Sequence, residues 1–207
     1  MIVDGHAIAE RILSEIEHDI KKRGAFPVLA VIAVAPNFAT KRYLSIKQKI
    51  AERLNIRVEM ILLEDSASTE EAVSAVHRAV SVSDGVVIQL PLPPYIDRAL
   101  VLEALPTSHD VDGIGGEFQR RINDMSILPP VVGAIDAIAR EHKVLFQDMN
   151  VLVVGEGILV GAPARAYAES RGAHVSVATK TSGTLQTLAQ HADIIILGSG
   201  VPGLLSA

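Results

Sequence analysis

The stretch "MNVLVVGEGILVGAP", residues 149–163, runs from a short apolar segment into three closely spaced glycines and then toward a helix. Continuous Val and Leu residues between polar turns are typical of a strand buried on both faces of a parallel sheet. A strand that ends in glycines at the start of a helix is also typical of a turn that holds a nucleotide phosphate. The same glycines would equally allow a helix to pack closely on a strand, so the pattern alone leaves both interpretations open.

The rest of the chain alternates helical and strand patterns in the same way. Apolar residues at Ile8, Ile12, Ile16 and Ile20 predict a helix over residues 6–23. A capping box, Ser68 with Glu71, predicts the start of another helix. Further helices are expected at 39–54, 133–143 and 160–171, together with a short helix between residues 179 and 193. Strands are expected at 28–35, 56–63, 85–90, 149–157 with its turn, 174–179 and 193–199. The sequence therefore predicts an α/β protein with parallel sheets.

Residues 110–130 form the longest stretch without a clear period, so the domain boundary is expected there. We expect an α/β substrate domain over residues 1–130 and a Rossmann-like dinucleotide-binding domain over residues 131–207. The second domain contains one β-α-β-α-β unit, whereas a complete dinucleotide fold needs two mononucleotide halves. It is therefore expected to be incomplete.

Composition narrows the class of protein. The 207 residues are 49% hydrophobic and carry a net charge of -5 with scattered basic residues, which argues against nucleic acid or an anionic membrane as partner. The longest apolar run, "VLAVIAVA", is far shorter than the ~20 residues that span a bilayer, and the N-terminus does not resemble a signal peptide. The absence of cysteine excludes a disulfide and suits a cytoplasmic protein. The seven histidines lack metal-ligand spacing, so no metal site is predicted.

Two stretches carry side chains suited to acid/base chemistry. Tyr43 and Lys47 lie four residues apart, which places a phenol beside an ammonium on one helix face. Gln89 lies just before the end of a predicted strand, where open parallel sheets bind ligands, and Asp112 lies in a glycine-containing turn. Each has a structural alternative: a tyrosine packed on a surface lysine, a glutamine that caps a strand, and an Asx turn made by Asp110 or Asp112.

Together these stretches resemble the methylenetetrahydrofolate dehydrogenase/cyclohydrolase family. The matches run in order along nearly the whole chain: "VDGHAIAERI" (3–12), "NFATKRYLSIK" (37–47), "GVVIQLPLP" (85–93), "DVDG" (110–113), "VLVVGEGILVGAP" (151–163) and "ADIIILGSGVPG" (192–203). The "QLPLP" stretch followed by "DVDG" is the most specific part. A shikimate-type or amino-acid dehydrogenase is disfavoured, because these two motifs have no role there.

The resemblance implies oxidation of 5,10-methylenetetrahydrofolate with NADP or NAD, followed by hydrolysis of the methenyl cation to 10-formyltetrahydrofolate. It implies that Lys47 is the catalytic lysine, that Gln89 tunes it and that Tyr43 packs against or polarises the folate. It also implies that Asp112 binds the pterin, with Leu90 and Pro91 as further substrate contacts. The implied cofactor residues are Gly155, Glu156, Gly157, Gly161, Lys180 and Ser182. A cytoplasmic homodimer is expected.

The departures from the family pattern weaken the oxidation step more than the hydrolysis step. The family's Gly-Arg-Ser turn reads Gly155-Glu156-Gly157 here, and Glu156 would repel a 2′-phosphate, although Lys180 would offset part of that repulsion. The family's Pro-Gly-Gly-Val-Gly loop and last helix lie outside these 207 residues, so a C-terminally truncated chain is expected. The sequence therefore favours retained cyclohydrolase over dehydrogenase activity, with an inactive folate-binding or dimerising module as the alternative.

Overall fold

The computed structural model describes residues 2–24, 26–125, 127–179, 185–201 and 203–205. The chain divides into two units, residues 1–120 and residues 121–207. Each unit is built on its own three-stranded parallel sheet. The prediction of an α/β protein with parallel sheets is therefore confirmed.

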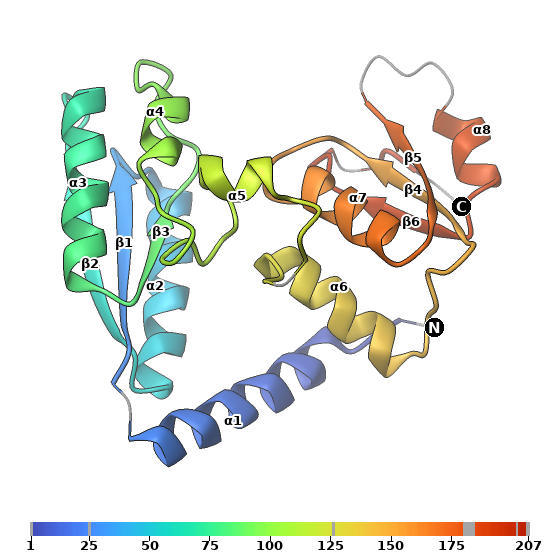
Figure 1. Ribbon diagram of the computed structural model, residues 1–207, viewed down its shortest axis with the longest axis horizontal. Coiled ribbons are helices and arrows are strands. Elements are labelled where there is room, and N and C mark those ends of the chain that lie inside the picture. The colour runs from blue at the N-terminus through green and yellow to red at the C-terminus, as the bar shows by residue number, and fades with distance from the viewer. Residues whose placement is uncertain (1, 25, 126, 180–184, 202, 206–207) are drawn as a thin grey trace. The chain divides into compact units, whose positions relative to one another are not determined.

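The first unit has β1 (Val28–Val34) at the centre of its sheet, between β2 (Arg57–Leu63) and β3 (Gly85–Ile88). Helix α2 (Phe38–Arg53) places Leu44 against β1 and β3, in a cluster with Val31, Ala33 and Val87. Helix α3 (Thr69–Val82) packs on β1 from the side opposite α2 (Figure 1). The central strand is thus covered on both faces, which explains its continuous apolar sequence.

The helices of this unit begin where the sequence supplies a cap. The Asn37 side chain accepts a hydrogen bond from the Thr40 amide at 2.9 Å and starts α2. Ser68 and Glu71 form the predicted capping box of α3, with reciprocal bonds of 3.2 and 2.7 Å. Helix α1 (Gly5–Arg23) agrees with the predicted helix and is joined to α2 by an ion pair between Glu10 and Arg53 at 2.9 Å.

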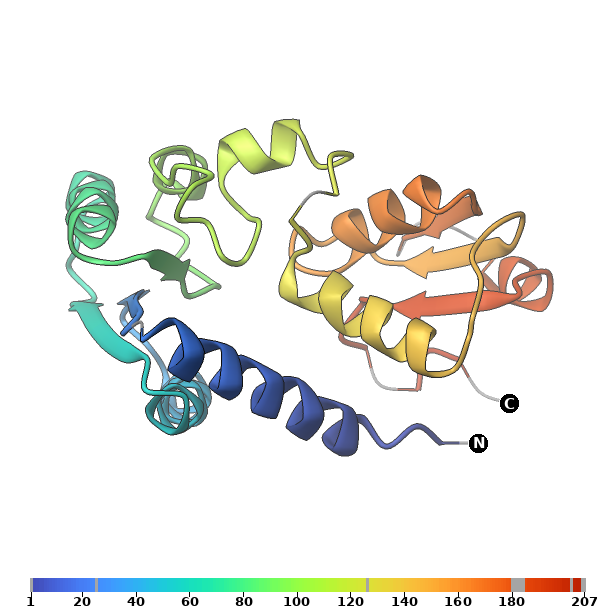
Figure 2. The ribbon, with the colours of Figure 1, turned by 60° about the horizontal axis from the view of Figure 1, so that its bottom comes forward.

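The second unit repeats the arrangement with β4 (Asn150–Val154) between β5 (His174–Ala178) and β6 (Ile194–Leu197). Helices α6 (Pro130–Glu141) and α7 (Gly161–Ser170) share one core cluster with β4, and Val132, Val153 and Tyr167 belong to it. Helix α8 (Leu185–Gln190) packs on the face of β4 that carries Leu152 and Val154 (Figure 2). One β-α-β-α-β unit is present, as the sequence predicts.

The structure differs from the sequence-based expectation at two boundaries and in two short helices. Strand β3 ends at Ile88, so Gln89 and Leu90 follow the strand rather than complete it. The short helices α4 (Arg98–Glu103) and α5 (Gly116–Arg120) lie in segments for which no helix is predicted. Helix α6 begins at Pro130 rather than near 133, because a proline fits the first position of a helix, where its missing N–H would have no partner.

Candidate functional site

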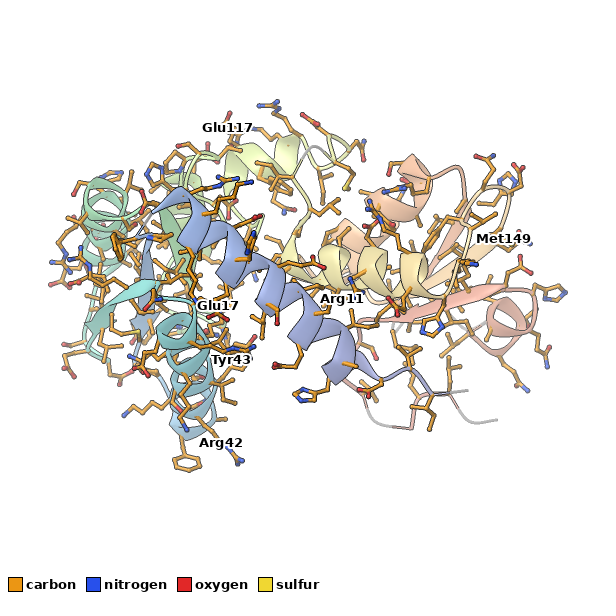
Figure 3. The ribbon with its side chains drawn as sticks, turned by 90° about the horizontal axis from the view of Figure 1, so that it is seen from below. Arg11, Glu17, Arg42, Tyr43, Glu117 and Met149 are labelled. Carbon is orange, nitrogen blue, oxygen red and sulfur yellow. The ribbon has the colours of Figure 1, made fainter. Side chains whose placement is uncertain are left out.

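The side chains of Lys47 and Tyr43 meet on the exposed border of α2, because Leu44 turns the helix's apolar face toward the sheet. The Lys47 Nζ lies 5.1 Å from the centroid of the Tyr43 ring, which is within the range of a cation–π contact. Tyr43 is 54% exposed and Lys47 is half-buried. Figure 3 labels Tyr43 on α2. The structure thus brings together the first two predicted residues.

Gln89 is held at the carboxyl end of β3 by its own backbone. Its amide donates to the Ile32 carbonyl at 2.8 Å, and its side-chain Nε2 donates to the Leu90 carbonyl at 2.8 Å. The Gln89 Oε1 is buried and has no hydrogen-bond partner among the described residues. A buried acceptor of this kind normally has a donor, so this oxygen is suited to a ligand or a water. Within the described part of the chain, Gln89 makes no hydrogen bond to Lys47.

The two aspartates of "DVDG" have different environments. Asp110 is buried, and its carboxylate accepts hydrogen bonds from the amides of Ile114 at 3.2 Å and Gly115 at 2.7 Å. Asp110 therefore fixes the turn, as the Asx-turn alternative requires. The Asp112 carboxylate accepts no hydrogen bond from the described residues and stays available to a ligand.

Burial and the charge of Lys47 shift the pKa of Asp112 in opposite directions. Burial raises the pKa of its carboxyl above the ordinary value, the charge of Lys47 lowers that pKa, and the charge of Asp110 raises it further. The lysine is therefore close enough to influence the aspartate. Asp112 is positioned because the preceding residues run alongside β3, with an amide of Val86 donating to the His109 carbonyl at 2.7 Å.

A pocket of about 360 Å³ opens in the first unit, and the described residues that line it do not include Lys47, Tyr43 or Asp112. Its lining includes the predicted residues Gln89 and Pro91, while Leu90 is half-buried next to them. The pocket also includes Asn37 and Thr40 from the start of α2, which the sequence analysis did not select as site residues. They precede Tyr43 by six and three residues in the "NFAT" stretch, and this shared motif is the signal that would have pointed to them.

The glycine turn of the second unit lies at the carboxyl ends of its three strands. Gly155 has φ +100°, a conformation that favours glycine, and its amide donates to the Ala178 carbonyl at 2.8 Å. A Cβ at Gly161 would overlap the Gly155 carbonyl oxygen, so α7 can start here only with a glycine. The glycines therefore do close the turn against the helix, as the packing interpretation requires.

The same turn also borders a cavity, which is what the nucleotide-binding interpretation requires. The cavity measures about 440 Å³ and is lined by residues at the carboxyl ends of β4, β5 and β6, among them Gly155, Glu156, Gly157, Thr179 and Gly198. Open parallel sheets bind dinucleotides at this edge, with the phosphates at the glycine turn. The residues present therefore fit a dinucleotide, except for the charge of Glu156. Lys180 and Ser182, the other predicted cofactor residues, lie outside the described residues.

The described residues meet the requirements of neither a metal site nor a membrane-spanning helix. No group of three or more His, Asp or Glu side chains in the described ranges is placed to hold a metal ion. Among the described residues, no helix has the length and apolar character that crossing a membrane requires.

Comparison with known proteins identifies the family of both units. The family model of the tetrahydrofolate dehydrogenase/cyclohydrolase catalytic domain matches residues 3–112, and that of the family's NAD(P)-binding domain matches residues 129–207. The bifunctional protein FolD of Methanoculleus marisnigri is 30% identical over 204 residues, which are 97% of this chain and 72% of the relative. FolD of Rickettsia bellii is 29% identical over 97% of this chain and 74% of its own length.

The solved structures agree with the family models. The crystal structure of the bifunctional enzyme FolD from Campylobacter jejuni matches with a TM-score of 0.90 and 27% identity, over 98% of this chain and 74% of that one. The NADP-complexed enzyme from Trypanosoma brucei has the same fold, with a TM-score of 0.91 at 23% identity over 99% of this chain and 73% of that one. The chain thus spans about three quarters of these relatives, and it belongs to the tetrahydrofolate dehydrogenase/cyclohydrolase family.

Proposed function

We propose that the chain interconverts one-carbon derivatives of tetrahydrofolate. The reactions are oxidation of 5,10-methylenetetrahydrofolate to the methenyl cation, with NAD(P) as oxidant, and hydrolysis of that cation to 10-formyltetrahydrofolate. The first unit holds the folate and the second holds the dinucleotide, in line with the two family models. The observation that carries the proposal is the contact of Lys47 with Tyr43 and the effect of its charge on Asp112, in the same unit as a buried Gln89 oxygen that has no hydrogen-bond partner among the described residues.

Hydrolysis is the better supported reaction, because every group it needs is found in the first unit. Water attacks the cationic carbon, its oxygen bonds to that carbon, and one proton must be taken away before a C–N bond breaks. A neutral amine is a competent proton acceptor, and we assign this role to Lys47. Tyr43 offers a ring face to the folate, and Asp112 offers a carboxylate to the donor edge of its heterocycle.

Oxidation depends on the second unit. NAD(P), when bound, supplies the acceptor for a hydride from the methylene carbon. The glycines at positions 155 and 161 provide a tight turn, and the cavity beside them provides space at the strand ends. Glu156 places a negative charge at the same edge, which opposes phosphate and makes oxidation the less supported of the two reactions.

Replacement of the proposed proton acceptor tests the hydrolysis. Lys47→Met keeps most of the aliphatic volume and removes the amine, so hydrolysis of methenyltetrahydrofolate should fall by at least roughly 100-fold. The measurement is the loss of methenyl absorbance in steady state, with circular dichroism to confirm folding. Lys49→Met removes the same charge from an exposed position of α2 and should leave the rate within about twofold.

The outcomes separate the proposal from its alternative. Equal hydrolysis by the unmodified chain and Lys47→Met would exclude Lys47 as the proton acceptor. Folate binding by the unmodified chain without any hydrolysis would favour a binding or dimerising module. A homodimer in the cytoplasm remains a prediction from the sequence resemblance, and light scattering and cell fractionation are the measurements that check it.

A further inference from the structure

Glu156 borders two cavities of the second unit. The larger, of about 440 Å³, is also lined by Ala178 and Thr179. The smaller, of about 210 Å³, lies against α7 and is also lined by Val177. Both cavities therefore reach the last residues of β5, and Glu156 is shared by the two.

The carboxyl end of β5 is where a dinucleotide fold of this kind recognises the ribose next to adenine. The usual recognition group is an acidic residue about 20 positions after the glycine turn, which accepts hydrogen bonds from the ribose hydroxyls. This chain has no acidic residue between Glu169 and Asp193, so the end of β5 supplies none. Glu156 instead brings a carboxylate to this region from within the turn itself.

Arg165 lines the smaller cavity with Glu156 but does not neutralise the negative charge there. The Arg165 Nε donates to the Glu169 Oε1 at 2.9 Å. The carboxylates of Glu169 and, more weakly, Glu156 raise the pKa of Arg165, so the guanidinium interacts with both. Among the described residues that line the smaller cavity, the charged side chains are this one cation and two carboxylates, which sum to about one negative unit.

From this geometry we infer that Glu156 makes the site select NAD over NADP, an inference that rests on the dinucleotide binding of the proposed function. A free ribose 2′-hydroxyl donates a hydrogen bond to a carboxylate, and such charge-assisted bonds are stronger than neutral ones. A 2′-phosphate carries nearly two negative charges and offers only acceptors at neutral pH, so Glu156 repels it. Among the described residues at this edge, Glu156 is thus the group that favours NAD, while Lys180, which would offset part of the repulsion, lies outside the described residues.

Calorimetric titration of NAD and of NADP into the full chain and three variants tests the inference. The unmodified chain should bind NAD at least about tenfold more tightly than NADP. Glu156→Gln should reduce this ratio, and Glu156→Arg should reverse it to favour NADP by about tenfold. Glu141→Gln is the matched control: it removes the same charge from a residue of the second unit that lines neither cavity, and it should leave the ratio unchanged.

Two results would overturn the inference alone: tighter binding of NADP than of NAD by the unmodified chain, or a ratio that neither Glu156 variant moves. Either would show that another group sets the selectivity while dinucleotide binding stands. Absence of binding of either nucleotide to all four proteins would instead remove the dinucleotide part of the proposed function, and the inference with it. Methenyltetrahydrofolate hydrolysis by the same samples reports separately on the first unit.

Discussion

Burial opposes the negative charge of Asp112, and Lys47 offsets only part of that effect. The fold holds the pKa of this carboxyl above its ordinary value of 3.8. Its ionisation at neutral pH therefore costs folding free energy, and the cost disappears as the pH falls through the folded pKa toward the unfolded one. Such a cost is expected of a residue kept for a ligand rather than for stability.

Asp112→Asn should accordingly raise the free energy of unfolding at neutral pH. The gain should shrink as the pH is lowered, because the wild-type carboxyl becomes protonated and the two side chains then carry the same charge. Urea denaturation at neutral and at acid pH measures the difference. Asp19→Asn, on the exposed side of α1, removes a solvated carboxylate and should show no comparable gain. A loss of stability for Asp112→Asn at neutral pH would contradict the argument.

At this scale the sequence predicted a contact between two side chains, but not the different environments of the two aspartates. Spacing predicted that Lys47 and Tyr43 share a helix face, and the 5.1 Å contact confirms it. Residue spacing did not show which of the two carboxylates is bonded to the backbone, because Asp110 and Asp112 both lie in one glycine-containing turn. The difference depends on the amides of Ile114 and Gly115, which the folded loop brings to Asp110.

At the scale of elements, regular patterns predicted the long helices and the strands, and the strand alternation predicted the short helix α8, whereas the short helices α4 and α5 were missed. Helices α4 and α5 have six and five residues, too few to show a helical period. Tertiary contacts place them instead, such as the pairing of Arg120 on α5 with Glu103 on α4 at 2.8 Å. Strand β3 also ends earlier than predicted, at Ile88. Its pairing with β1 stops at Ile32, and the local sequence pattern does not encode where this pairing stops.

At the junction between β4 and α7, the effect of an alanine on stability should differ between Gly161 and Gly157. Gly161→Ala should destabilise the second unit by roughly 1–3 kcal/mol, because its Cβ would overlap the Gly155 carbonyl oxygen. Gly157→Ala should change stability by less than about 1 kcal/mol, since a Cβ there meets no atom within 4 Å. Thermal denaturation compares the two. Equal stability of both variants would show that the turn can relax away from the helix.

The whole molecule contains separate cores for its two sheets. The cluster around Val151 draws its buried members from residues 132–168, and the cluster around Val31 draws its own from residues 31–87. Neither cluster crosses the division between residues 120 and 121. A cavity made in one core therefore removes contacts from one sheet only, and stability should be lost locally.

Hydrogen exchange of the full chain tests this separation with a reciprocal pair of variants. Val151→Ala should lower amide protection in β4, β5 and β6 and leave β1, β2 and β3 near their wild-type rates, while Val31→Ala should do the reverse. Each substitution deletes a fully buried side chain at a cost on the order of 2 kcal/mol, which changes exchange rates of the affected sheet by roughly 30-fold. Equal losses of amide protection in both sheets from either variant would show that the two units unfold together. In that case, destabilising substitutions in the second unit would also lower the proposed folate hydrolysis in the first. Local loss would mean that variants of the dinucleotide site can be studied without disturbing the first unit, because the free energy that holds Lys47, Tyr43 and Asp112 in place comes from a different core.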